Sequence, residues 1–375
     1  YMARIAYMLD RVFRLFGLHG SSIMPYMISG GIAGGCAVPG VMGTRTLRSP
    51  KEKLATMLTL PFMACGAKIP VFLLIVGAFF AEENQAAIML GHTLLGWAVA
   101  LLSARALRST LIRGGPTPFV MELPPYRLPT LRGLLLHTWE RGWQYIKKAG
   151  TVILAISVIL WAAMKFPGLP EDVARDFDTR IAVAGEQVEN ANEAYTAKLL
   201  AEGKPVPAEE SVEAGPDDSP EGAALAEAKD TLDELIHNKA AAELRNSVAG
   251  RIGTAFEPVS RLAGFDWRTN IALLGGFAAK EVLVSTLGTA YSLGEVDPEE
   301  AGSLGDKIKA DPNWNKANAV SLLIFVLIYA PCAVTIVTMR METATWRWPL
   351  FSLFASTALA YVLAVTVYQI GRTLI

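Results

Sequence analysis

A glycine-rich stretch inside the first long apolar segment constrains the fold more than any other part of the sequence. The segment runs from about residue 22 to 43, long enough to cross a bilayer, and residues 30–40 carry five glycines, a cysteine and a proline. A helix interior loses about 1 kcal/mol for each glycine and about 3 kcal/mol for a proline. We therefore predict a broken transmembrane helix that presents Cys36 near the bilayer midplane. Close helix packing through the Gly30/Gly34 spacing is the alternative.

The composition is typical of a polytopic membrane protein. Hydrophobic residues make up 52% of the 375 residues, and the formal net charge is −1, so no basic surface indicates a nucleic-acid partner. The three cysteines all lie in apolar segments, and such an odd, sparse set is not a disulfide framework. The sequence opens on Tyr1 in the middle of a helical pattern, so we expect further residues before it.

About seven apolar segments are expected in total, and several are interrupted. After the first they span residues 54–80, 86–106, 149–166, 268–290, 318–339 and 347–370. An amphipathic helix is expected over residues 1–20, and an interfacial helix over residues 134–148. The positive-inside rule places the basic loops at 45–53 and 105–148 in the cytoplasm. Whether residues 268–290 cross the membrane or re-enter on one side is left open by the sequence.

A polar region divides the apolar segments into two halves. Residues 167–266 are predicted to be a mostly helical extramembrane insertion, with helices at roughly 172–202 and 221–248 that form a soluble hairpin outside the cell. Its charges are interpreted as a solvated surface, because they include no ligand cluster. Residues 1–166 and 267–375 are then the first and second membrane halves.

The two halves contain a weak internal repeat. When Gly30-Gly31 is superposed on Gly275-Gly276, Cys36 falls on Glu281, and Cys65 falls on Cys332 once an extra loop at 292–317 is allowed for. Paired interrupted segments in two halves are the best sequence indication of a transporter's substrate site. If the second segment re-enters, the repeats are inverted.

The repeat predicts a metal site formed by Cys36, Cys65, Cys332 and Glu281. Thiolates are soft ligands for transition metals, and a carboxylate adds negative charge. The alternative is that each cysteine is a small buried hydrophobe and that the Lys280–Glu281 pair makes an internal ion pair or a helix-end contact. Further residues predicted to line the path or to break helices are Gly35, Pro39, Met63, Lys280 and Pro331. No phosphate-binding loop occurs, so no enzymatic activity is predicted for this chain.

Several sequence pieces resemble the membrane portion of the ferrous iron transport protein B (FeoB) family. In chain order they are Tyr1-Met2-Ala3-Arg4, Gly17-Leu18-His19-Gly20, Gly35-Cys36-Ala37-Val38-Pro39, Thr44-Arg45-Thr46, Pro61-Phe62-Met63-Ala64-Cys65, Glu122-Leu123-Pro124-Pro125-Tyr126, Ala279-Lys280-Glu281-Val282 and Tyr329-Ala330-Pro331-Cys332. The resemblance implies Fe²⁺ uptake across the bacterial cytoplasmic (inner) membrane. It also implies that the broken regions are paired Gate motifs whose cysteines line the iron path.

The resemblance further implies partners outside this sequence. Family members carry an N-terminal GTP-binding domain, which is missing here, so GTP and Mg²⁺ would act only through that G domain, and the full-length protein would be a GTPase. A small cytosolic Feo partner, a homo-oligomer and the membrane lipid are the other expected partners.

We therefore predict an all-α, polytopic helical membrane protein with two Gate-like repeats and a soluble helical hairpin insertion, acting as an Fe²⁺ permease. Two alternatives stay open. A nucleoside or organic-solute carrier of the Gate type would place aromatic and amide groups around the broken helices. A membrane scaffold that binds a partner through the hairpin would be indifferent to the cysteines.

Overall fold

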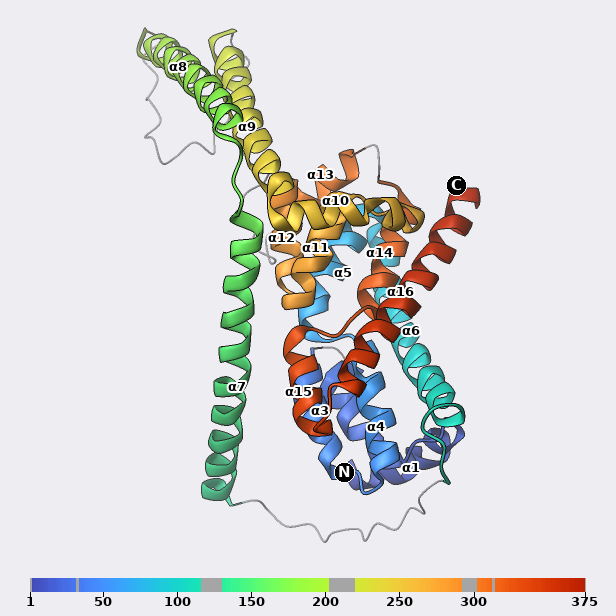
Figure 1. Ribbon diagram of the computed structural model, residues 1–375. Helices are drawn as coiled ribbons and strands as arrows, with labels where there is room; N and C mark the ends of the chain where they lie inside the picture. The colour runs from blue at the N-terminus through green and yellow to red at the C-terminus, as the bar shows by residue number, and fades with distance from the viewer. Residues whose placement is uncertain are drawn as a thin grey trace.

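The computed structural model describes residues 2–31, 34–115, 130–201, 220–291, 302–311 and 314–374. Within these ranges the chain is helical and contains no β-strand, which confirms the predicted all-α class. Figure 1 shows a helical bundle, a long helix α7 that stands apart from it, and the pair α8 and α9 that projects from one end. The motif piece at 122–126, all but the last residue of the predicted turn at 203–220, and residues 292–301 and 312–313 of the predicted loop at 292–317 lie outside the described residues.

The first apolar segment is interrupted where its glycines predict. Helices η1 (Gly20–Ser22), α2 (Ile23–Tyr26) and η2 (Met27–Gly31) end at the glycines, and α3 (Ala37–Gly43) begins beyond them. Gly30 has a φ of 120° and Gly34 a φ of 83°, in the left-handed region that favours glycine. Cys36 is extended, with φ −133° and ψ 135°.

The same segment folds back on itself and does not cross the bundle as one broken span, so the predicted crossing is wrong. A Cβ placed on Gly40 would lie 1.8 Å from Oγ of Ser29, so the two arms pack side by side. The reversal follows from the two positive-φ glycines between the arms. Pro39 is the third residue of α3, in a first turn whose N–H groups need no intrahelical acceptor. It therefore starts the second arm and does not break a helix, contrary to the prediction.

The segment at 268–290 has the same shape. Helix α11 (Trp267–Ala278) ends at an extended Ala279, and α12 (Val282–Ala290) begins three residues later. A Cβ on Gly275 would lie 2.7 Å from Oγ1 of Thr286, so α11 and α12 also pack as a helical hairpin. Of the two arrangements that the sequence left open for residues 268–290, crossing or re-entry on one side, the structure has the fold-back that re-entry requires.

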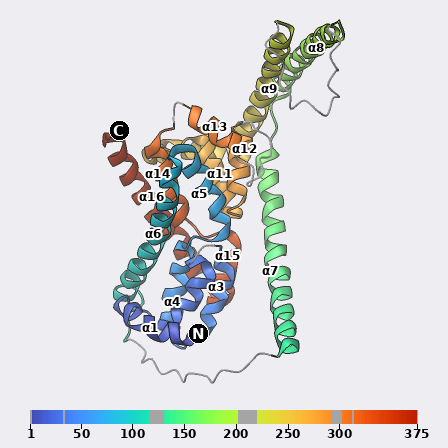
Figure 2. The ribbon, with the colours of Figure 1, turned by 180° about the vertical axis from the view of Figure 1, so that it is seen from behind.

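Two interrupted spans run past the hairpins in opposite directions. The first comprises α4 (Pro50–Thr59), η4 (Leu60–Phe62), η5 (Gly66–Lys68) and α5 (Ile69–Phe79), and the second comprises α14 (Lys316–Ile328) and α15 (Ala333–Thr343). In Figures 1 and 2 the first rises from α4 to α5 while the second descends from α14 to α15. The first hairpin lies beside α4 and α15, and the second lies beside α5 at the other end of the bundle.

Long helices flank this core. Three stretches of the described residues are long and apolar enough to cross a membrane: Glu82–Ser109 (α6), Lys316–Thr343 and Arg347–Thr373 within α16 (Arg347–Leu374). Two shorter apolar helices are Gly66–Phe79 and Leu154–Lys165. Helix α1 (Met2–Leu15) precedes the first hairpin, and α13 (Gly302–Ala310) packs on α5 with Leu304 and Ile308 fully buried.

Residues 131–165 form one continuous helix, α7 (Leu131–Lys165). The prediction of a separate interfacial helix at 134–148 followed by a span from 149 is therefore wrong. No proline occurs between residues 131 and 165, so nothing in the backbone ends the helix where its side chains change from amphipathic to apolar.

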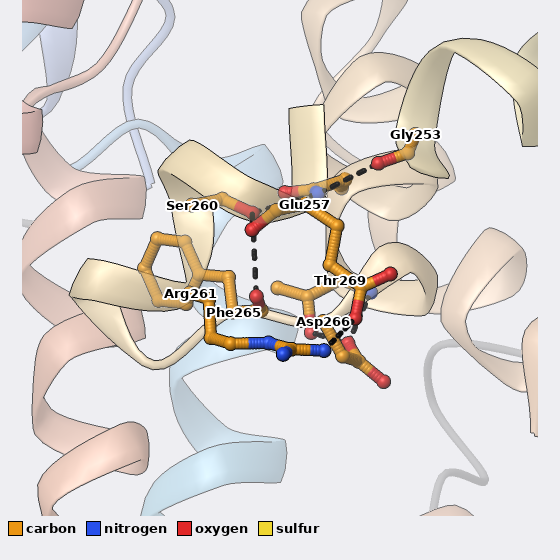
Figure 3. Close-up of polar contacts among 8 residues, drawn as sticks. Gly253, Glu257, Ser260, Arg261, Phe265, Asp266 and Thr269 are labelled. Atoms are coloured by element: carbon orange, nitrogen blue, oxygen red, sulfur yellow. Dashed lines mark hydrogen bonds and ion pairs between the residues drawn. The ribbon is translucent and has the colours of Figure 1, made fainter. Parts of the chain in front are cut away.

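The polar insertion contains the two predicted helices, α8 (Glu171–Ala201) and α9 (Pro220–Asn246), packed against each other. Helix α10 (Val248–Ser260) and η6 (Arg261–Ala263) follow and lie against α11 and α16 of the bundle. Figure 3 shows the junction, with Gly253 and Ser260 among its labelled residues. Nδ2 of Asn270 donates to the Gly253 carbonyl at 2.9 Å and to Oγ of Ser260 at 2.8 Å. These bonds fix the first arm of the second hairpin.

Candidate functional site

A cavity of about 180 Å³ lies where the tips of both hairpins meet the breaks of both interrupted spans. Four short pieces of chain form its wall, and each is a place where a helix ends. The lining residues used below are Gly35, Cys36, Met63, Cys65, Lys68, Ala279, Lys280, Glu281, Ala330, Pro331, Cys332 and Thr335. Eight of the nine residues singled out from the sequence are among them; Pro39 is not.

Backbone hydrogen bonds join the first hairpin tip to the first break. The Gly66 N–H donates to the Gly35 carbonyl at 2.8 Å, and Gly35 and Cys65 form an isolated parallel β-bridge. A Cβ on Gly30 would lie 2.4 Å from the carbonyl oxygen of Ala64, so only glycine permits this approach. Cys36 and Cys65 are therefore brought to one wall of the cavity by main-chain geometry.

The second break reaches the same cavity from the other half of the chain. Val38 and Val334 are buried against each other, with Cys36 and Cys332 packed on them. Sγ of Cys332 lies 3.1 Å from Oγ1 of Thr335. All three cysteines are partly exposed.

Two buried lysines line the cavity, and the sequence singled out only one of them. Nζ of Lys280 donates to the Ala330 carbonyl at 2.8 Å and lies 3.0 Å from the Tyr329 ring centroid. This is the helix-end contact weighed as an alternative for Lys280. Nζ of Lys68 donates to three carbonyls, at 2.7–3.2 Å, of which Leu327 belongs to the second break. A lone lysine inside an apolar span was the sequence signal for Lys68.

The predicted metal ligands share the cavity but not a coordination sphere. Across the described residues, no group of three or more His, Cys, Asp or Glu side chains lies close enough to hold one ion. Glu281 is largely exposed at the tip of the second hairpin, while the three thiols approach from the other pieces.

An ion-pair cluster also joins the two halves of the chain. Glu342, at the end of α15, accepts from Nε of Arg45 at 2.7 Å and from Nζ of Lys53 at 3.2 Å. The Glu342 side chain is only 5% exposed. In Figure 1 these elements lie at the end of the bundle nearest α3 and α4, away from the second hairpin.

Comparison with known protein families identifies the family to which this architecture belongs. A family model named Gate, described as "Nucleoside recognition", matches residues 1–79 and 146–346, which include both hairpins and both interrupted spans. The chain belongs to the Gate family. A second model, described as "Ferrous iron transport protein B C terminus", matches residues 89–141 of this Gate-family chain.

The relatives of this Gate-family chain are iron transporters by name. It is 36% identical over 379 residues to the Fe(2+) transport protein A/Fe(2+) transporter FeoB fusion protein of Porphyromonas gingivalis, over 99% of the chain and 40% of that protein. It is 31% identical to the Fe(2+) transporter FeoB of Campylobacter jejuni and 32% identical to that of Helicobacter pylori strain J99, over 100% of the chain and 50% and 52% of those proteins.

These matches confirm the resemblance to the membrane portion of the FeoB family and indicate a multi-pass membrane protein. The chain spans about half the length, or less, of the curated relatives it matches. No solved structure shows a significant match.

Proposed function

We propose that this chain is the membrane permease part of an Fe²⁺ uptake system in the bacterial cytoplasmic membrane. The observation that carries the proposal is the cavity, in which three thiols and one carboxylate from both halves of the chain line one space. The names of the relatives support Fe²⁺ as the cargo.

The donor set suits a ferrous ion in transit. Fe²⁺ must exchange part of its water shell for protein ligands, and those ligands must be few, or the ion would not leave. Sulfur from Cys36, Cys65 and Cys332 favours a transition metal over alkali and alkaline-earth cations, and Glu281 supplies charge. The opposite directions of the two interrupted spans allow the hairpin tips to open the cavity alternately to either side of the membrane.

The driving element is assigned to protein outside this chain. The family resemblance predicts a G domain that binds GTP and Mg²⁺, and the greater length of the relatives leaves room for it. The fusion of a transport protein A to the relative in P. gingivalis supports a small partner of that kind. The basic loop that contains Arg45 and Lys53 faces the cytoplasm by the positive-inside rule, where both partners would act.

Uptake by vesicles that contain the chain, with and without a supplied G domain, tests the proposal. Cys36→Ser, Cys332→Ser and Glu281→Gln each change one donor with little change of shape. At low Fe²⁺ concentration, each variant should take up Fe²⁺ at least about tenfold more slowly. Loss of a residue that only supports a metal ligand already lowers metal affinity or activity by about tenfold or more, so loss of a ligand should cost at least as much. Thr366→Ser, on exposed α16, is the matched control. Normal Fe²⁺ uptake by all three variants, at equal membrane abundance, would refute the proposed metal site.

The thiols also give the site a pH dependence. Each cysteine releases a proton when it binds metal, so protons compete with Fe²⁺ and the affinity should rise as the pH rises. The concentration of Fe²⁺ that gives half-maximal uptake should therefore fall from pH 6 to pH 8, about the range in which proton competition with a thiol is felt. A pH-independent half-maximal concentration would exclude thiols as the ligands.

A nucleoside carrier is the second candidate, because the Gate family model carries the description "Nucleoside recognition". The same vesicles distinguish the two functions. Uptake of radiolabelled nucleoside, unaffected by Cys36→Ser, would favour the nucleoside carrier over the iron permease.

A further inference from the structure

The broken helices leave backbone carbonyl groups around the cavity that could bind cations other than Fe²⁺. A helix end leaves its last carbonyl groups without intrahelical partners. Such oxygens are the ligands that Na⁺, K⁺, Mg²⁺ and Ca²⁺ prefer. The carbonyls concerned belong to Pro61 and Met63 at the first break and to Leu327 and Ala330 at the second.

The amino group of Lys68 occupies three of these carbonyls. Its side chain is buried, with the residue 2% exposed, and Nζ lies 2.9 Å from the Pro61 oxygen, 3.2 Å from that of Met63 and 2.7 Å from that of Leu327. Three acceptors require three N–H donors, which only the charged ammonium supplies. Lys68 is thus a fixed cation that links the first break to the second.

The fourth of these carbonyls, that of Ala330, accepts a hydrogen bond from Lys280, which lies at the tip of the second hairpin. The residue is 4% exposed, and Nζ donates to the Ala330 oxygen at 2.8 Å. The face of the Tyr329 ring, 3.0 Å from Nζ, supplies the cation–π contact that suits an ammonium group. Within the described residues, the hydrogen bonds of both amino groups go to backbone oxygens and none goes to a carboxylate.

We infer that Lys68 and Lys280 determine the cation specificity of the cavity, an inference that rests on the proposed function. Their amino groups take up the oxygen ligands at the breaks and leave the three sulfurs and Glu281 for the cargo. A hard cation that enters finds the carbonyls occupied and meets the Lys68 ammonium group that three of them hold. Fe²⁺ meets the same obstacles but gains thiolate ligands, which a hard cation binds poorly.

The test compares Fe²⁺ and Ca²⁺ in vesicles that contain the full chain and its G domain. Lys68→Met and Lys280→Met remove the amino group and keep an unbranched side chain, and Lys316→Met, at the exposed start of α14, is the matched control. Fe²⁺ uptake and the entry of Ca²⁺, read by a trapped fluorescent indicator, are measured on the same preparations. The ratio of Fe²⁺ to Ca²⁺ flux should fall about tenfold in each cavity variant, equivalent to ~1.4 kcal/mol of lost discrimination, and stay unchanged in the control.

Two further measurements keep the inference falsifiable if a variant does not fold. Lys68→Gln retains N–H donors without the charge, so it should also lower the ratio. In the unmodified protein, excess Ca²⁺ should leave Fe²⁺ uptake unchanged, and strong inhibition by equimolar Ca²⁺ would overturn the inference without any variant. Folded lysine variants with an unchanged flux ratio would also overturn it while leaving the iron permease standing. Absence of Fe²⁺ uptake by the unmodified protein would instead refute the proposed function.

Discussion

Two glycines dock the hairpins onto the interrupted spans. A Cβ on Gly30 would lie 2.4 Å from the Ala64 carbonyl oxygen at the first break, and a Cβ on Gly276 would lie 2.5 Å from the Tyr329 hydroxyl at the second. Both glycines belong to the weak internal repeat seen in the sequence. Each half therefore uses a glycine of the repeat for a close approach between its own hairpin and its own span, although Gly276 corresponds to Gly31 and not to Gly30.

Gly30→Ala should destabilise the protein by about 2–4 kcal/mol. The methyl group meets backbone that cannot yield easily, and the φ of 120° is strained for any residue with a Cβ. Thermal unfolding of the purified protein in detergent measures the loss. Gly91→Ala on α6 has open space around its Cβ and should be neutral or stabilise by up to about 1 kcal/mol. Equal melting temperatures for the two variants would contradict the docking role.

At the scale of elements, the cluster around Glu342 joins α15 of the second half to the basic loop and α4 of the first. A carboxylate near a helix C-terminus is unfavourable with the helix dipole, so two cations from the other half compensate it. Arg45 and Lys53 provide them. We expect this cluster to keep the cavity closed at this end.

Glu342→Gln should loosen that closure. Charged hydrogen bonds contribute about 1.5–3 kcal/mol, so modification of Cys36 and Cys332 by an impermeant maleimide from this side should become about tenfold faster. Glu257→Gln on α10 breaks an ion pair with the exposed Arg261 of η6 and is the control. Unchanged modification rates in Glu342→Gln would show that the cluster does not govern access.

At the scale of the whole molecule, the α8–α9 hairpin is an appendage whose two ends lie together. Nδ2 of Asn246 donates to the Gly168 carbonyl at 2.8 Å, and the Val248 N–H donates to the Phe166 carbonyl at 2.9 Å. Figures 1 and 2 show the rest of the hairpin directed away from the bundle. Ion pairs such as Lys239–Asp178 join α8 to α9 and do not reach the cavity.

Replacement of residues 170–246 by a short Gly-Ser linker should therefore leave Fe²⁺ uptake unchanged. The bundle keeps its contacts because the chain is rejoined where it already meets itself. Uptake by vesicles matched for inserted protein measures the result, and a linker variant that inserts correctly but does not transport would assign the hairpin an essential role.

The sequence by itself determined the interruption within residues 30–40 and the two helices of the insertion, because glycine and proline act on their own backbone. It wrongly divided α7 near residue 148, where neither glycine nor proline ends the helix, and it did not single out Lys68. Only the tertiary structure decided that residues 22–43 fold back, since the reversal depends on docking against Ala64 and Gly66. It also decided that Lys68 reaches the Leu327 carbonyl, 259 positions away in the chain. Such contacts form between distant segments whose packing no local pattern encodes.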